Sequence, residues 1–304
     1  MWFDPKVLSK IKPMELRAKL IVEGFLVGMH RSPYHGFSVE FREHRPYQPG
    51  DEPKRIDWKI YARQERLYTK QFEEETNSLV HIILDGSNSM SYGSNHLTKF
   101  EYAATLSACL SWLLIHQRDA VSFTIFDEKI SSYLPPSGTK LQLSRILQTL
   151  DKAKPSYQTK IPDVLNEISA RIKKKGIVIF LSDLLAPEAD IIKALKNIRY
   201  RKNEVIVFHI LDPAELHLPF KESAIIKDIE THEKLPITPD IKQIYQKELQ
   251  KFIDTYRQNF HLHNIDYLLL PTSEPLEKSL VFYLARRRKR PGLGFRRRAI
   301  SHKR

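Results

Sequence analysis

Hydrophobic and polar positions from residue 79 onward follow two alternating periods. Short continuous apolar runs, rich in β-branched residues, predict buried strands; they lie at 79–84, 120–126, 177–181, 205–211 and 267–270. Between them, apolar residues recur at helical spacing; these segments are 99–117, 141–150, 161–174, 188–199, 240–260 and 275–287. Strands alternating with helices predict an α/β fold, a mainly parallel sheet with helices on both faces.

Two other stretches break this rhythm. Before the first buried run, Phe37, Val39 and Phe41 alternate with polar residues as in a half-buried strand, and residues 66–72 form a second candidate strand. Residues 212–238 are interrupted by prolines, which indicates a small insertion.

The first apolar run ends in candidate chemistry. Asp85 closes the run, and Ser87 and Ser89 follow at alternate positions, so their oxygens can converge on one point. A carboxylate with two hydroxyls is an all-oxygen set, which suits Mg²⁺ or Mn²⁺ better than Zn²⁺. In the alternative interpretation the stretch is a turn in which Ser89 caps the next helix.

A second buried run, 177–185, contains Asp183 near its end. If the two strands are parallel neighbours, Asp183 reaches the same sheet edge as Asp85, where ligands of open α/β sheets bind. Thr159, on the loop before the helix that starts near Pro162, can reach this edge too, or is an ordinary loop threonine.

This set resembles the metal-ion-dependent adhesion site of von Willebrand factor A domains. In that family the serines and the threonine bind Mg²⁺ directly, the aspartates act largely through water, and a partner's carboxylate often fills the open position. One departure is Gln158, where the family often has glycine before the threonine. The resemblance implies as ligands Asp85, Ser87, Ser89, Thr159 and Asp183.

Residues 36–76 sharpen the resemblance. Together with HILDPAELHLPF at 209–220 and YLARR near Tyr283, they resemble the bacterial family called domain of unknown function fifty-eight over nearly all of 20–287. The signature comprises Glu43, Arg45, Tyr47, Gly50, Asp51, Arg55, Ile56, Asp57, Trp58, Ala62, Arg63, Phe72 and Glu75.

The family resemblance implies two parts and a partner. The parts are a smaller N-terminal helical and β-containing segment (1–76) and a von Willebrand A-like domain (77–287), and the dense positive charge that follows predicts a basic, disordered tail (288–304). Such proteins are often encoded beside MoxR-type AAA+ ATPases, with which they are thought to act as chaperone-like or complex-maturation factors.

Charged residues within the signature allow two interpretations. Arginine forks match carboxylates bidentately, which predicts a structural ion-pair network. The same arginines could instead contact a partner or a phosphate. The residues concerned are Arg45, Arg55 and Arg63 with Glu43, Asp51 and Asp57.

Two function classes follow from these motifs. The chain has no nucleophile paired with a base near Asp85 and no phosphate-binding Gly-x-x-x-x-Gly-Lys loop, which favours a non-enzymatic, metal-dependent protein-interaction module. The alternative is a Mg²⁺-dependent phosphoryl-transfer hydrolase with Asp85 as nucleophile. Haloacid-dehalogenase-like phosphatases require a second aspartate two residues on, where this chain has Ser87.

Composition bounds the cellular setting. The 304 residues are 41% hydrophobic, enough for a sizeable core, and include one cysteine, Cys109, which cannot form an internal disulfide. No apolar run approaches the ~18 residues of a membrane span, and the N-terminus lacks a signal-peptide pattern. We therefore expect a cytoplasmic protein without a transmembrane segment.

The net charge of +13 is concentrated in one segment. Residues 286–304 hold ten of the 49 Lys and Arg and no acid, so the rest of the chain has 39 basic against 36 acidic residues, a net charge of +3. Such a tail can contact an acidic protein, anionic lipid or nucleic acid, or can be solvated with no dedicated partner.

Overall fold

The computed structural model describes residues 11, 13–30, 44–47, 61–62, 66–70, 78–156, 160–219, 224–227, 234–237 and 239–289. The chain divides into two compact units. The larger unit comprises Met1–Leu26 and Asn77–Arg304, and the smaller comprises Val27–Thr76.

A six-stranded sheet forms the centre of the larger unit, in the order β10-β7-β6-β3-β4-β5. All neighbouring pairs are parallel except β4 and β5. This confirms the predicted α/β fold with a mainly parallel sheet, which is the von Willebrand A-like architecture. The strands are β3 (Leu79–Asp85), β4 (Ala120–Phe126), β5 (Ile130–Ser137), β6 (Ile177–Ser182), β7 (Glu204–Leu211) and β10 (Asp266–Pro271).

Sequence periodicity missed β5, the antiparallel strand at one edge of the sheet. This strand contains Pro135 and Pro136, and its residues are mostly half-buried or exposed. Proline cannot donate to a strand ladder and is tolerated only at an edge, so the strand carries neither the apolar run nor the alternation that would have revealed it.

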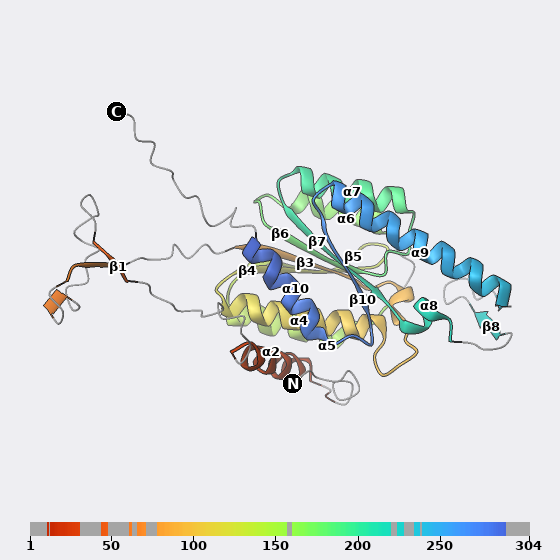
Figure 1. Cartoon of the computed structure of the whole chain (residues 1–304), viewed down its shortest axis with the longest axis horizontal. Helices are drawn as coiled ribbons and strands as arrows, with labels where there is room; N and C mark the ends of the chain where they lie inside the picture. The colour runs from red at the N-terminus through yellow and green to blue at the C-terminus, as the bar shows by residue number, and fades with distance from the viewer. Residues whose placement is uncertain are drawn as a thin grey trace. The chain divides into compact units, whose positions relative to one another are not determined.

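Helices cover both faces of the sheet (Figure 1): α6, α7 and α9 lie on one face, and α4, α5 and α10 on the other. Their positions agree with the predicted helical segments. The bounds are α4 (Lys99–His116), α5 (Lys140–Lys152), α6 (Ile161–Arg171), α7 (Glu188–Tyr200), α9 (Pro239–Leu262) and α10 (Leu276–Lys289). In the described part of the chain, no helix is long and apolar enough to cross a membrane.

The central strands are buried on both faces. Every residue of β6 is buried, and Ile83, Phe180 and Val207 from adjacent strands pack into one cluster with side chains of α6, α7 and α9. Burying apolar area contributes about 25 cal/mol per Å², so this core holds the carboxyl ends of the strands in a defined arrangement.

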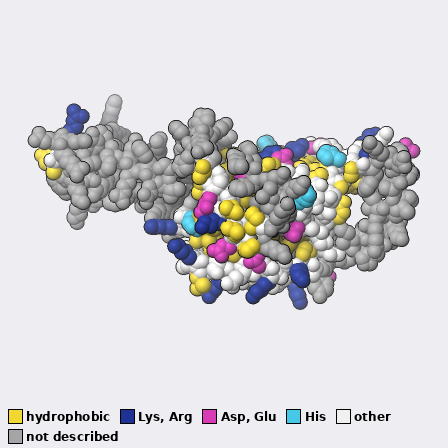
Figure 2. Space-filling model, turned by 90° about the horizontal axis from the view of Figure 1, so that it is seen from below, with side chains coloured by type: hydrophobic (Ala, Val, Ile, Leu, Met, Phe, Trp, Pro, Cys, Tyr) yellow, Lys and Arg dark blue, Asp and Glu magenta, His cyan; other side chains and the backbone are white. Residues whose placement is uncertain are grey.

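Helix α2 (Met14–His30) packs outside α4 and α5. The Arg17 guanidinium donates to the Thr105 hydroxyl at 3.1 Å and to the Ile11 carbonyl at 2.7 Å, and the Met14 N–H donates to Asp151 at 3.3 Å. Residues up to Leu26 therefore belong to the larger unit, although the sequence groups them with residues 1–76. Seen from below, Figure 2 shows hydrophobic side chains gathered among charged ones.

The proline-rich stretch after β7 contains three short elements. They are α8 (Pro213–His217) and an antiparallel pair of strands, β8 (Ala224–Lys227) and β9 (Lys234–Ile237). Asp212 begins α8 with a capping box: its carboxylate accepts from the Ala214 N–H at 2.8 Å, and Glu215 accepts from the Asp212 N–H at 2.8 Å. This box positions Glu215 beside the strand ends.

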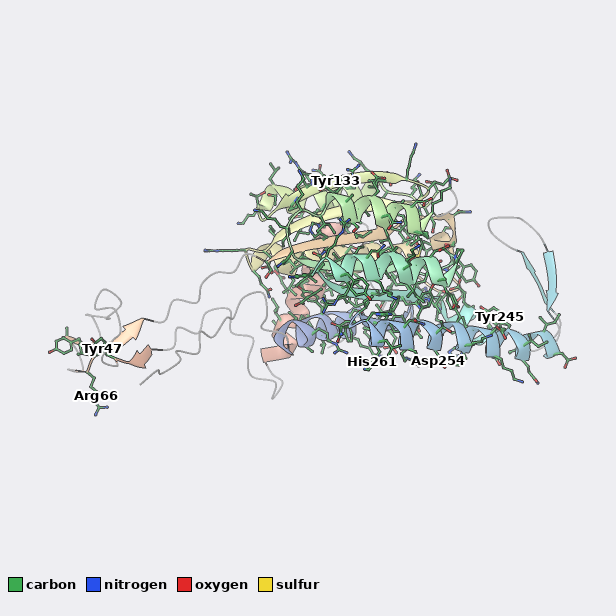
Figure 3. All side chains as sticks on the ribbon, turned by 90° about the horizontal axis from the view of Figure 1, so that it is seen from above. Tyr47, Arg66, Tyr133, Tyr245, Asp254 and His261 are labelled. Atoms are coloured by element: carbon green, nitrogen blue, oxygen red, sulfur yellow. The ribbon has the colours of Figure 1, made fainter. Side chains whose placement is uncertain are left out.

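The smaller unit contains an antiparallel pair, β1 (His44–Pro46) and β2 (Tyr68–Lys70). The Tyr47 N–H donates to the Leu67 carbonyl at 2.8 Å, and Figure 3 shows the side chains of Tyr47 and Arg66 beside this pair. Strand β2 lies within the candidate strand 66–72. The candidate strand 37–41 and the side chains of the proposed ion-pair network lie outside the described residues.

Candidate metal centre

Two buried carboxylates lie at the carboxyl ends of neighbouring parallel strands. Asp85 is the last residue of β3, Asp183 directly follows β6, and the register pairs Leu84 with Leu181. Both aspartates are 0% exposed. The structure therefore brings these two predicted site residues to one edge of the sheet.

Hydrogen bonds fix the Asp85 carboxylate. Its Oδ1 accepts from the Ser87 N–H at 3.0 Å, and its Oδ2 accepts from the Ser182 hydroxyl at 2.6 Å. Burial and the neighbouring Asp183 raise the pKa of Asp85 to about 7, although the bonds from Ser182 and Ser87 favour its ionised form. The sequence analysis did not single out Ser182, which orients this carboxylate from β6.

The two serines face each other after β3. The hydroxyls of Ser87 and Ser89 are 3.1 Å apart, and both side chains are buried. Ser89 lies inside a short 3-10 helix, η2 (Asn88–Ser91), whose N-cap residue, Ser87, makes no side-chain capping bond. Helix α4 has Thr98 as its N-cap, in a capping box with Glu101. The interpretation of Ser89 as the cap of the next helix is therefore wrong, and both hydroxyls are available at the strand end.

Thr159, the fifth predicted ligand, lies outside the described residues. The chain on either side of it is anchored near the site. The Ser156 N–H donates to the Gly86 carbonyl at 2.9 Å, and the Lys160 N–H donates to the Asp127 carbonyl at 3.3 Å. Gly86 follows Asp85 directly, so the chain that leads to Thr159 starts beside Asp85, and Thr159 as a ligand stays a prediction.

A buried lysine that the sequence analysis did not identify lies beside Asp183. The Lys99 ammonium is 2.8 Å from Asp183 Oδ2 and 2.7 Å from Glu215 Oε1, and its side chain is 1% exposed. Burial disfavours the charged form of Lys99, but the two carboxylates outweigh this and raise its pKa above the usual value. Lys99 is therefore a resident cation at this edge.

One sequence signal could have indicated this role for Lys99. It is the first residue of α4, where the helix dipole disfavours positive charge. Lys140 occupies the same position in α5 and is exposed, so what distinguishes Lys99 in the sequence is the apolar helix that follows it.

The backbone at Asp183 is held from β7 and β10. A carbonyl oxygen can only accept, so His209 donates through Nε2 to the Asp183 carbonyl at 3.0 Å. The other nitrogen of the neutral ring, Nδ1, then accepts from the Tyr267 hydroxyl at 2.7 Å. Burial lowers the pKa of His209 to about 4, which keeps the imidazole neutral at physiological pH. Asp183 Oδ1 also accepts from the Leu185 N–H at 3.3 Å.

The donor set fits a hard divalent cation. Two buried carboxylates and two facing hydroxyls supply only oxygen, as Mg²⁺ and Mn²⁺ prefer, whereas zinc sites are rich in His and Cys. Among the described residues, no group of three or more His, Cys, Asp or Glu could hold a metal ion. A cation here would therefore depend on hydroxyls as well as on Asp85 and Asp183.

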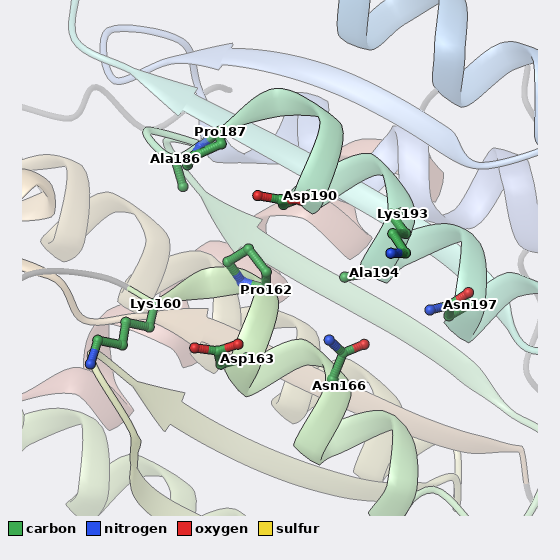
Figure 4. Close-up of a pocket in the computed structure, with 10 residues that line it drawn as sticks. All are labelled: Lys160, Pro162, Asp163, Asn166, Ala186, Pro187, Asp190, Lys193, Ala194 and Asn197. Atoms are coloured by element: carbon green, nitrogen blue, oxygen red, sulfur yellow. The ribbon is translucent and has the colours of Figure 1, made fainter.

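A groove of about 440 Å³ runs between α6 and α7. Figure 4 shows Asp163 and Lys160 on the α6 side, and Asp190 and Lys193 on the α7 side. Its chain segments continue from the candidate site, because Lys160 follows Thr159 and the α7 side begins three residues after Asp183, at Ala186. The groove thus offers charges of both signs, mostly on the two helices that follow the candidate site.

The family of the chain is established by its match to a family model described as "Protein of unknown function DUF58", over residues 43–254. The chain belongs to the DUF58 family. This confirms the resemblance seen in the signature and in residues 209–220. The DUF58 match spans the smaller unit's described strands, the candidate site and α8.

Relatives and solved structures of low sequence identity also resemble this DUF58 chain. Uncharacterized proteins of Mycobacterium tuberculosis and Mycobacterium bovis are 25% identical over 231 residues, which is 75% of this chain and 72% of each relative. BatB from Bacteroides thetaiotaomicron has 18% identity and a TM-score of 0.46, over 70% of this chain and 99% of that one. The SpRpn10 VWA domain has 13% identity and a TM-score of 0.42, over 67% and 93%.

Proposed function

We propose that the protein is a non-enzymatic protein-interaction module that binds Mg²⁺ or Mn²⁺ through Asp85, Ser87, Ser89, Thr159 and Asp183. The observation that carries the proposal is the facing pair of serine hydroxyls, 3.1 Å apart, at the strand end that also holds the buried Asp85. The ion, when bound, would supply an open coordination position for a carboxylate of the partner.

The ligand set leads us to expect modest metal affinity. Hydroxyls are neutral ligands, so only Asp85 and Asp183 offset the charge of the cation, and Asp183 already contacts Lys99. Affinity of oxygen sites for hard cations depends on the number of charged ligands. Calorimetry at millimolar Mg²⁺ or Mn²⁺ measures this binding, and Asp85→Ala should abolish it. Absence of binding, with the partner present, would contradict the metal site.

The partner that we propose is an AAA+ ATPase of the MoxR type, in chaperone-like or complex-maturation work. The family resemblance supplies this class of partner. A contact through one metal-bound carboxylate is small, and the groove between α6 and α7 could extend it through Lys160, Asp163, Asp190 and Lys193. Complementary charges of both signs give an interface specificity and register.

The hydrolase alternative has weaker support. Both oxygens of Asp85 accept hydrogen bonds that hold the carboxylate in one place, whereas a nucleophile must move onto a phosphorus atom; a fixed carboxylate suits an ion site better. Ser87 also stands where a haloacid-dehalogenase-like enzyme needs its second aspartate. Turnover of a generic phosphate ester with Mg²⁺, abolished by Asp85→Ala, would favour the enzyme.

Binding of the ATPase to serine variants tests the interaction module. Ser87→Ala with Ser89→Ala should weaken the affinity at least tenfold, because two direct ligands are lost, and a chelator should produce the same loss in the wild-type protein. Ser144→Ala is the matched control, since Ser144 is exposed on α5. Affinity unchanged by the double substitution and by chelator would contradict metal-dependent docking.

A further inference from the structure

The cluster around Lys99 carries an inference that rests on the proposed metal site and deepens it. Lys99 occupies one oxygen of a proposed metal ligand, Asp183 Oδ2, at 2.8 Å, and is shared with Glu215 at 2.7 Å. The Lys99 and Asp183 side chains are 1% and 0% exposed, whereas Glu215 is 21% exposed. Water therefore screens the Lys99–Asp183 contact little.

The structure holds Lys99 in this place from several directions. The backbone N–H of Lys99 donates to the Tyr92 carbonyl at 2.9 Å, and Thr98 caps the helix that Lys99 begins. The capping box of α8 positions Glu215. An ammonium held in place beside a metal ligand repels an incoming divalent cation, while the Glu215 carboxylate attracts one. At an effective dielectric of about 20, the interaction of two unit charges 4 Å apart corresponds to about a thousandfold in binding, and a divalent cation is affected more strongly.

We infer that Lys99 is a built-in counter-ion that lowers the affinity of the proposed metal site for divalent cations, and that Glu215 on α8 limits this effect. The formal charges of the three carboxylates of Asp85, Asp183 and Glu215 and of the Lys99 ammonium add to −2. Removing the lysine makes this local charge −3, and neutralising Glu215 makes it −1. The affinity for a cation should follow the same order.

Calorimetric titration of the full chain with Mn²⁺ tests the inference in wild type and four variants. Lys99→Met should bind at least tenfold more tightly than wild type, and Glu215→Gln at least tenfold more weakly. The double variant restores the wild-type formal charge and should bind within about threefold of wild type. Lys140→Met is the control, because Lys140 is also the first residue of a helix with a threonine N-cap but is exposed.

Thermal unfolding gives a second readout. Lys99→Met leaves Asp183 buried without its ammonium, so this variant should be less stable than wild type without metal and should gain more in melting temperature from Mn²⁺. If Lys99→Met does not fold, Glu215→Gln, at a partly exposed position, tests the order of affinities by itself.

The outcomes separate this inference from the proposed function. If wild type binds Mn²⁺ and Lys99→Met and Glu215→Gln bind it with the same affinity, the role of Lys99 is overturned and the metal site stands. Weaker binding by Lys99→Met would also overturn it, since Lys99 would then support the site. No binding by any of the proteins would overturn both the inference and the metal site.

Discussion

At the scale of single residues, buried ionisable groups in this fold differ in whether an opposite charge compensates them. Lys99 is compensated by two carboxylates and stays charged. His81, in the middle of β3, has only a hydroxyl partner, with Nδ1 2.7 Å from the Ser122 hydroxyl. Because burial acts without a compensating charge, it lowers the pKa of His81 to about 4, and the folded protein holds a neutral imidazole.

His81 predicts a pH dependence of stability. Between pH 6.5 and about 4, His81 is protonated in the unfolded chain but neutral in the folded protein. The contribution of His81 to the unfolding free energy is therefore complete above pH 6.5 and is lost as pH falls towards 4. The loss is about 3 kcal/mol at 1.36 kcal/mol per pKa unit. His81→Gln should reduce the slope of the unfolding free energy against pH, measured by urea denaturation.

The control for this measurement is His96→Gln, the same substitution at an exposed histidine. Some slope should remain in His81→Gln, because burial also lowers the pKa of His209 to about 4. Equal slopes in wild type and His81→Gln would show that His81 does not contribute.

At the scale of elements, the close pairing of β3 and β6 brings Asp85 and Asp183 together, and Gly176 permits this pairing. A Cβ at position 176 would lie 2.3 Å from the Leu79 carbonyl oxygen. The Gly176 N–H donates to the Asn203 side chain at 3.1 Å, and its carbonyl accepts from the Glu204 N–H at 2.9 Å. The backbone is therefore fixed on both sides and has little room to shift.

Gly176→Ala should destabilise the protein by about 2–3 kcal/mol, because the added methyl group meets backbone and not a movable side chain. The measurement is thermal or urea unfolding. Gly138→Ala is the matched control: its nearest atom, the Asp119 carbonyl oxygen, would lie at 3.1 Å, so its cost should be smaller. Gly176 lies at the opposite end of β6 from Asp183, so the Mn²⁺ affinity of the folded variant should not change.

At the scale of the whole molecule, charge is unevenly distributed. Ten Lys and Arg lie in residues 286–304, while the rest of the chain is nearly neutral. Helix α10 extends to Lys289, two residues into the segment predicted as tail, and Arg286 on this helix is 3.4 Å from Asp266. Part of the basic run thus belongs to the fold, and residues 290–304 lie outside the described residues.

Deleting residues 290–304 should leave the affinity for the ATPase within about threefold of wild type at physiological salt. Exposed charges are screened over about 8 Å under these conditions, so the tail should affect the association rate more than specificity. Association kinetics at low and physiological salt measure both effects. Loss of binding in the deletion variant, with binding retained in the double serine variant, would place the docking site in the tail.

Patterns in the amino-acid sequence predicted the central strands, the helices that cover them and the strand ends at which Asp85 and Asp183 lie. These features follow from local apolar periodicity, which is readable within a few residues. The contacts of Lys99 depend on the tertiary structure, because Asp183 and Glu215 lie 84 and 116 residues further along the chain. The antiparallel β5 and the docking of α2 through Arg17 also depended on it, since an edge strand and a distant hydrogen-bond partner leave no periodic signal in the sequence.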